Sequence, residues 1–322
     1  MQFISLCSLL VLTLLSDLPA EAAPAPAHTQ PVTGQAGRVI LFVLEGLNQH
    51  ALTAGPMPTL TRLAKQGSVT WSAETVSPLP LPAMASLLTG LPVDKHGITW
   101  NRFEFSRGYP RPPTVFDYLD LSGGRDSAVF FMNEALYQLA KPEPYTDFQL
   151  CGPLRPECTP QRMVSYIKQY LAKAVSGHGF GHAILALPDL LVVHLPQGSR
   201  AGDAHGWESK EYRRELRSVD GTIEAIVDLY RQHGLLSEAA IFVTSLNGAG
   251  PTDVSGVPWI ASGSGIKPGH LIRKPVSLID TGATVMQTLG LQTHTEWDSR
   301  PVDEIFLHEP ASPVARRKEL QP

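Results

Sequence analysis

Apolar residues in this chain gather in short continuous runs that alternate with amphipathic segments. Five runs consist almost entirely of Val, Ile, Leu, Phe and Ala, which is typical of strands covered on both faces. They span residues 39–44, 127–132, 190–195, 239–244 and 257–261. Strands that alternate with helices favour an α/β fold with a largely parallel central sheet and helices on both of its faces.

The segments between these runs carry helix start and stop signals, namely N-cap residues, a first-turn proline and terminal glycines. The expected helices cover 58–66 before Gly67, 160–175 after the Thr159 cap, 210–234 after the Ser209 cap, and 278–289 before Gly290. No internal repeat or linker interrupts this pattern. It predicts one domain over residues 38–310, followed by a tail over 311–322.

The first residues form an apolar run, Phe3 to Leu15, that is too short to span a bilayer and precedes the small-residue site Ala20-Glu-Ala22. This arrangement predicts a secretory signal peptide over residues 1–22, although no Lys or Arg precedes the run. Residues 23–37, rich in Pro, Ala, Thr and Gln, are expected to form a disordered leader. We therefore expect a secreted or periplasmic protein with no membrane attachment after cleavage.

Composition adds limits on the partners. A chain of 322 residues with 43% hydrophobic content can bury a full core. The formal net charge of -4 and the pI near 6.3 give no reason to expect nucleic acid or an anionic membrane as a partner.

Two cysteines remain after removal of the predicted signal peptide, Cys151 and Cys158. An even pair in an oxidising compartment predicts a disulfide that closes the short loop between them. A single pair without further Cys or His partners would make a poor zinc site.

Several motifs, in order along the chain, resemble those of one enzyme family. Val39-Ile-Leu-Phe-Val-Leu-Glu-Gly46 is a buried strand that ends in a carboxylate, and the proline-rich turn over 75–90 is followed by Asp94-Lys-His-Gly97. Val257-Pro-Trp-Ile-Ala-Ser-Gly-Ser-Gly-Ile-Lys-Pro-Gly269 is the most specific match, and the segments 190–207, 240–245 and 278–306 accompany it. Together they resemble the type I phosphodiesterase/nucleotide pyrophosphatase branch of the alkaline-phosphatase superfamily. The resemblance implies a three-layer sandwich, here without room for a large cap domain.

The resemblance also locates the nucleophile position. In the family, this turn has the sequence P-T-x-T-x-P-N-H-x-S-L-x-T-G. When Ser86-Leu-Leu-Thr-Gly90 is aligned with the end of this motif, Pro80 occupies the position of the reactive Thr. Proline offers neither a hydroxyl nor a backbone N–H. Ser77 is the fallback hydroxyl, although three nearby prolines stiffen the turn. The family's Asn-His becomes Ala83-Met84, which removes an amide that would bind a phosphoryl oxygen.

Family members hold two metal ions, usually zinc, with six side chains at the carboxyl ends of strands. The residues at the matching positions, none of the family type, are Glu45, Ser199, Asp203, Leu246, Asn247 and Asp253. Without imidazole or thiolate this set is not expected to bind zinc. Its five oxygen-bearing members are tentative ligands for a hard ion, Ca²⁺ or Mg²⁺. In the alternative, Arg200 or Lys95 neutralises the carboxylates and Glu45 accepts hydrogen bonds from backbone amides.

Three functions follow from the resemblance and the substitutions. The first is a secreted non-catalytic pseudoenzyme that binds a small phosphorylated or nucleotide-like ligand. The second is an active metal-dependent hydrolase of phosphodiester or pyrophosphate bonds with a rearranged site. The third is a structural or interaction domain. Because function depends on sites rather than on folds, the substitutions favour the non-catalytic functions.

Overall fold

The computed structural model describes residues 36–54, 57–142, 146, 148–150, 158–177, 186–250 and 256–307. The predicted signal peptide, residues 23–35 of the predicted leader, Cys151, Asp253 and the tail lie outside the described residues. The Cys151–Cys158 disulfide therefore stays a prediction. Ala36 and Gly37, assigned to the leader from the sequence, donate backbone hydrogen bonds to Thr288 and Glu238, so they belong to the folded domain.

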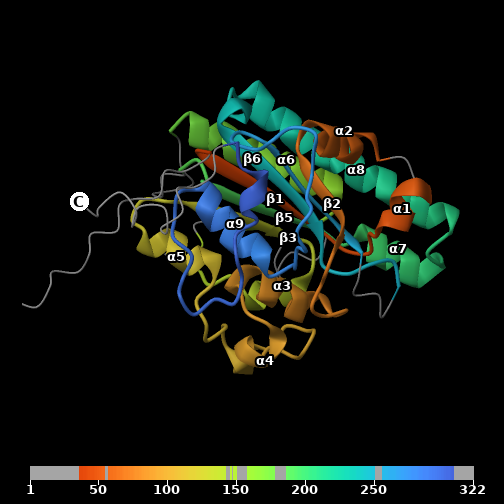
Figure 1. Cartoon of the computed structure of the whole chain (residues 1–322), viewed down its shortest axis with the longest axis horizontal. Helices are drawn as coiled ribbons and strands as arrows, with labels where there is room; N and C mark the ends of the chain where they lie inside the picture. Colours follow the sequence, from red (N-terminus) through yellow and green to blue (C-terminus); the bar gives the residue numbers. More distant parts are fainter. Residues whose placement is uncertain are drawn as a thin grey trace, which may run out of the picture. The chain divides into compact units, whose positions relative to one another are not determined.

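Eight strands form one sheet in the order β4-β3-β5-β1-β6-β7-β2-β8 (Figure 1). Their bounds are β1 Arg38–Leu44, β2 Ser68–Ala73, β3 Ser127–Phe131, β4 Phe148–Leu150, β5 Leu190–Leu195, β6 Ala239–Ser245, β7 Val257–Gly263 and β8 His270–Leu271. Within the described part of the chain, every neighbouring pair is parallel except those that include β7, which runs antiparallel to β6 and β2. The predicted α/β fold with a largely parallel sheet is confirmed.

Helices lie between the strands as the sequence predicts. Their bounds are α1 Gln49–Ala54, α2 Pro58–Gln66, α3 Pro80–Thr89, α4 Val93–His96, α5 Val115–Leu121, α6 Pro160–Val175, α7 Gln197–His205, α8 Lys210–Gln232 and α9 Asp280–Thr288. Four 3-10 turns accompany them, η1 Phe105–Arg107, η2 Glu134–Gln138, η3 Leu236–Glu238 and η4 Asp303–Ile305. Among the helices described, none combines the length and apolar character needed to cross a membrane.

The two faces of the sheet bury separate hydrophobic clusters. Along β1, Val39, Leu41 and Val43 point into a cluster with α3, α5 and α9, whereas Ile40, Phe42 and Leu44 point into a cluster with α2, α6 and α8. This alternation is the strand period of two. Figure 1 shows the two helical layers on opposite sides of the sheet, which confirms the predicted three-layer arrangement.

The strand β2 was not predicted, because its sequence Ser-Val-Thr-Trp-Ser-Ala mixes polar and apolar residues. It lies near the edge of the sheet, between β7 and the two-residue strand β8. A strand in this place does not need the uninterrupted apolar sequence of a central parallel strand.

The packing of α3 against α4 depends on one buried histidine. His96 Nδ1 accepts a hydrogen bond from the Ile98 amide at 3.0 Å, so the proton lies on Nε2, 2.9 Å from the Ser86 hydroxyl. Burial, opposed by the charge of Asp94, lowers the pKa of His96 from 6.5 to about 4. The neutral imidazole therefore fixes the position of α3, whose first turn lies in the site described below.

This histidine predicts an acid-dependent loss of stability. The unfolded chain takes up a proton on His96 near pH 6.5 and the folded chain only near pH 4, so the free energy of unfolding falls as the pH drops between these values. We expect this one group to cost about 3 kcal/mol at pH 4 relative to pH 7. Urea unfolding across this range should show a weaker pH dependence for His96→Asn than for the wild type. Equal pH dependence in both proteins would contradict the assignment.

Candidate functional site

The carboxyl ends of β5, β1 and β6 lie side by side, with Leu44 paired with Leu195 on one side and with Ser245 on the other. The residues that follow these strands therefore emerge at one edge of the sheet, where open α/β folds place their sites. Three of the predicted site residues, Glu45, Ser199 and Asn247, lie at this edge, and all three are buried.

The side-chain amide of Asn247 joins three segments at this edge. Its Oδ1 accepts a hydrogen bond from the Gly46 amide at 2.7 Å and one from the Ser199 hydroxyl at 3.3 Å. Its Nδ2 donates to the Pro78 carbonyl at 3.1 Å. One amide thus connects the end of β1, the first turn of α7 and the turn that leads into α3.

The first turn of α7 packs directly on the end of β1. The Ser199 amide donates to the Glu45 carbonyl at 3.2 Å. Gly46 has a positive φ of 75°, and a Cβ there would lie 2.4 Å from the Ser199 amide nitrogen. Only glycine fits this approach without strain. Tyr212 of α8 adds a hydrogen bond of 2.6 Å from its hydroxyl to the Gly46 carbonyl.

Glu45 forms a buried contact with a histidine of the neighbouring strand. His194 Nε2 lies 2.8 Å from Glu45 Oε1, and the His194 side chain is fully buried. Since a carboxylate accepts hydrogen bonds, Nε2 carries the proton. Within the described residues, His194 Nδ1 has no hydrogen-bond partner. Glu45 therefore bonds to an imidazole, and not to backbone amides alone as the sequence had suggested.

The first turn of α3 has no free amide to offer a ligand. Pro80 and Pro82 lack N–H groups, the Leu79 amide donates to Ser77 Oγ at 3.1 Å, and the Leu81 amide donates to Asn101 Oδ1 at 3.0 Å. The next amide, of Ala83, already bonds to the Leu79 carbonyl at 3.1 Å. A helix N-terminus normally leaves such donors available for an anion. Here every described donor of that turn is absent or used.

Ser77, the fallback hydroxyl, is part of the same turn. It is buried, and its Oγ accepts the hydrogen bond from Leu79. Its backbone carbonyl lies 3.4 Å from the Thr75 hydroxyl, which also donates to the Leu246 carbonyl at 2.5 Å. The hydroxyl of Ser77 therefore serves as a local cap for the turn.

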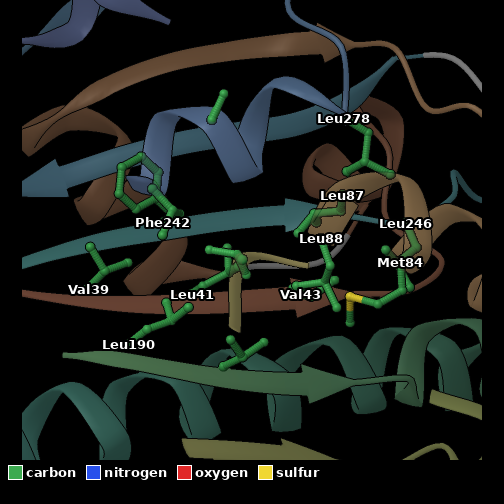
Figure 2. Packing of buried hydrophobic residues seen from close by; sticks show 14 of the residues in the cluster. Val39, Leu41, Val43, Met84, Leu87, Leu88, Leu190, Phe242, Leu246 and Leu278 are labelled. Carbon is green, nitrogen blue, oxygen red and sulfur yellow. The ribbon is translucent and has the colours of Figure 1, made fainter. Parts of the chain in front are cut away.

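Leu246 belongs to the hydrophobic core. It is fully buried in the cluster that includes Val43, Met84 and Leu88, whose side chains are labelled with that of Leu246 in Figure 2. An apolar side chain therefore occupies the position at which the family resemblance implies a metal-binding carboxylate.

The other residues predicted for this site have different environments. Asp203 is exposed on α7, and Asp253 lies outside the described residues. Within the part of the chain that the structure describes, the two cations of the alternative interpretation have other partners. Lys95 pairs with Asp298 at 2.6 Å, and Arg200 donates to the Met132 carbonyl at 2.6 Å.

The side chains present do not fit a pair of zinc ions. Within the described residues, no group of three or more His, Cys, Asp or Glu side chains is placed to hold a metal ion. Asn247 Oδ1 already accepts two hydrogen bonds, and Glu45 Oε1 bonds to His194. Zinc is bound by Cys, His, Asp and Glu side chains that are free to coordinate it. No reaction step is therefore assigned to a metal.

Two residues of this region were missed in the sequence. His194 is the single polar residue in the run Leu190-Leu-Val-Val-His-Leu195, and an imidazole inside such a run is the signal that could have identified it. Asn101, which holds the Leu81 amide, lies in a loop with no distinguishing pattern. Its role depends on a contact across twenty residues that the sequence does not indicate.

The match of a family model decides the class of the protein. The model for type I phosphodiesterase/nucleotide pyrophosphatase matches residues 39–262, which is more than half of the chain. The chain belongs to this family, within the alkaline-phosphatase superfamily.

Individual relatives are more distant. The chain is 32% identical over 108 residues to sulfatase ppz1 of Metarhizium majus, and spans about a quarter of that relative, 26% of its length. Among solved structures, Ps i-CgsB in complex with k-i-k-neocarrahexaose has a TM-score of 0.64 and 16% identity, covering 83% of this chain and 74% of that one. An inactive variant of murine ectonucleotide pyrophosphatase/phosphodiesterase 5 in complex with AMP has a TM-score of 0.63 and 11% identity, covering 84% and 99%. At these identities the structures support the fold alone.

The predicted Ca²⁺ or Mg²⁺ site can be tested by calorimetry. If Glu45, Ser199, Asp203, Asn247 and Asp253 hold a hard ion, titration of the purified protein should give a saturable heat that Asp253→Ala and Asp203→Ala reduce. Asp228→Ala, an exposed carboxylate on α8, serves as the matched control. No binding of either ion up to millimolar concentration would rule out the site.

Proposed function

We propose that this chain is a non-catalytic member of its family that binds an anionic, sugar-containing ligand without cleaving it. One observation carries the proposal. The first turn of α3, where the family resemblance places the nucleophile and the phosphoryl group, begins at Pro80 and has no free N–H donor among its described residues.

The chemistry of ester cleavage explains why this observation is decisive. The developing negative charge of the transition state needs preorganised donors or cations, and the reaction needs an activated nucleophile. The described edge supplies neither. It presents one carboxylate, Glu45, paired with His194, and an amide, Asn247, whose oxygen is already used.

The retained scaffold supports a binding role. The sheet, both helical layers and the close packing of α7 on β1 are all present, while the sequence resemblance implies other residue types at the catalytic positions. The AMP of one structural neighbour and the oligosaccharide of another belong to those proteins, and they motivate the ligand class proposed for this one. The predicted export from the cell accompanies this proposal and rests on the N-terminal sequence alone.

A turnover assay tests the absence of catalysis. We expect no hydrolysis of bis-p-nitrophenyl phosphate above the buffer rate with zinc, manganese, calcium or magnesium, and no change in Glu45→Ala or Ser77→Ala. Circular dichroism melting should confirm that each variant is folded. Metal-dependent turnover that either substitution abolishes would support instead an active hydrolase with a rearranged site.

The variant Pro80→Thr makes the test sharper. It returns a hydroxyl and one backbone N–H to the nucleophile position but leaves the residues at the family's metal-ligand positions unchanged, so it should stay inactive. Turnover by Pro80→Thr would show that the proline at this position is the sole cause of the lack of catalysis.

A further inference from the structure

The loop between α4 and α5, whose backbone follows α4 in Figure 1, contains exposed aromatic and basic residues. Phe105 is 88% exposed and Tyr109 is 47% exposed, and the side chain of Arg102 is 82% exposed. Segment 98–111, called the rim loop below, contains three arginines and one glutamate, a net charge of +2 in a chain whose formal charge is -4. Aromatic and basic side chains together on one loop suggest a recognition surface.

One buried glutamine, in η2, holds the rim loop in position. Gln138 is only 2% exposed. Its Oε1 accepts a hydrogen bond from the Glu104 amide at 2.9 Å, and its Nε2 donates to the Gly108 carbonyl. Both ends of the turn Phe105–Arg107 are therefore fixed by a single side chain. A loop that is ordered before binding loses less conformational entropy when a ligand arrives.

Contacts within the rim loop also hold its charged side chains in position before a ligand binds. Glu104 contacts Arg102 at 2.9 Å and Arg107 at 2.5 Å. Hydrogen bonds from Arg107, and then from Arg102, hold the pKa of the Glu104 carboxyl below its usual value. The Arg107 guanidinium lies 4.3 Å from the centre of the Trp100 ring. These contacts hold the Arg102 and Arg107 guanidinium groups in position beside Glu104.

A hydrogen bond connects the rim loop to the edge of the sheet. The Leu81 amide of α3 donates to Asn101 Oδ1, and the turn before α3 bonds through Pro78 to Asn247. Leu79, at the same helix end, is 41% exposed. The loop therefore borders the site in which the proposed function places a ligand.

We propose that the rim loop binds a sulfated oligosaccharide, with sugar rings packed on Phe105 and Tyr109 and sulfate groups paired with Arg102, Arg107 and Arg111. The planar guanidinium group matches tetrahedral oxyanions in a two-point geometry. Transfer of the apolar face of a sugar ring from water onto an aromatic side chain is favourable. This inference rests on the proposed ligand-binding function and names the ligand class and the residues that recognise it.

The spacing of the charges favours such a chain over a nucleotide. A nucleotide concentrates its charge on one phosphate group, which needs several donors converging on one point, and the first turn of α3 offers none. Arg102 and Arg107 both contact the Glu104 carboxylate, and Arg111 follows further along the loop, beyond Phe105 and Tyr109 in the sequence. An arginine pair and a third arginine, with exposed aromatic residues between them in the sequence, suit a linear ligand with repeated anionic groups.

Isothermal titration calorimetry tests the proposal with a sulfated carrageenan hexasaccharide, its desulfated counterpart and AMP as the probes. The wild type should bind the sulfated hexasaccharide more tightly than the other two, and raising the salt concentration should weaken binding. Phe105→Ala should reduce the affinity on the order of tenfold. Arg102→Ala should reduce it less and flatten the salt dependence. The matched controls Leu271→Ala and Arg214→Ala, which remove an exposed apolar and an exposed basic side chain elsewhere, should bind as the wild type does.

Gln138→Ala tests the role of the fixed loop separately. It removes no exposed side chain, so we expect weaker binding of the sulfated hexasaccharide with an unchanged salt dependence. Equal binding by the wild type and the Phe105→Ala and Arg102→Ala variants would overturn the rim-loop assignment while leaving a ligand-binding function intact. Binding of AMP in preference to the hexasaccharide would overturn the sulfated-sugar assignment. Release of sulfate or phosphate from any probe would instead contradict the non-catalytic function.

Discussion

One side-chain amide holds the functional edge of this protein together. Asn247 receives hydrogen bonds from Gly46 and Ser199 and donates one to the Pro78 carbonyl, so the end of β1, the start of α7 and the turn before α3 depend on the same three bonds. Buried polar groups of this kind are costly if they lose their partners. A neutral amide thus links three segments that are far apart in the sequence.

The rest of the edge follows from this arrangement. Because the Pro78 carbonyl is tied to Asn247, the proline-rich turn is fixed, and its donors are used by Ser77 and Asn101. Because Leu246 packs with Val43 and Met84, the space beneath the turn is apolar. Glu45 is the one carboxylate among the predicted site residues that the structure describes at this edge, and His194 holds it by hydrogen bonding. The described polar groups of this edge bond to one another. We therefore assign ligand recognition to the rim loop, where Gln138 and Glu104 hold exposed side chains in position before a ligand binds.

Much of this architecture can be predicted from the sequence. The continuous apolar runs identified the five central strands to within about two residues, and the caps Thr159 and Ser209 correctly marked the starts of α6 and α8. The motif order identified the family that the family model confirms. The strand β2 was not predicted because its polar residues interrupt the continuous apolar run by which the other strands were identified. The convergence of Glu45, Ser199 and Asn247 could be expected from strand ends, but their partners could not. His194 contacts Glu45 and Pro78 contacts Asn247 across long sequence separations, and Asn101 bonds instead to the Leu81 amide. Of these three partners, only His194 leaves a local signal, an imidazole inside an apolar run.

The most direct test of the central claim is the free energy of unfolding in urea of the wild type and Asn247→Ala, each measured in the presence of EDTA. If the amide links the three segments without a metal, EDTA leaves the wild type unchanged and the substitution costs about 3 kcal/mol. If the variant is as stable as the wild type, or if EDTA alone destabilises the wild type by a comparable amount, the amide is not what holds this edge together.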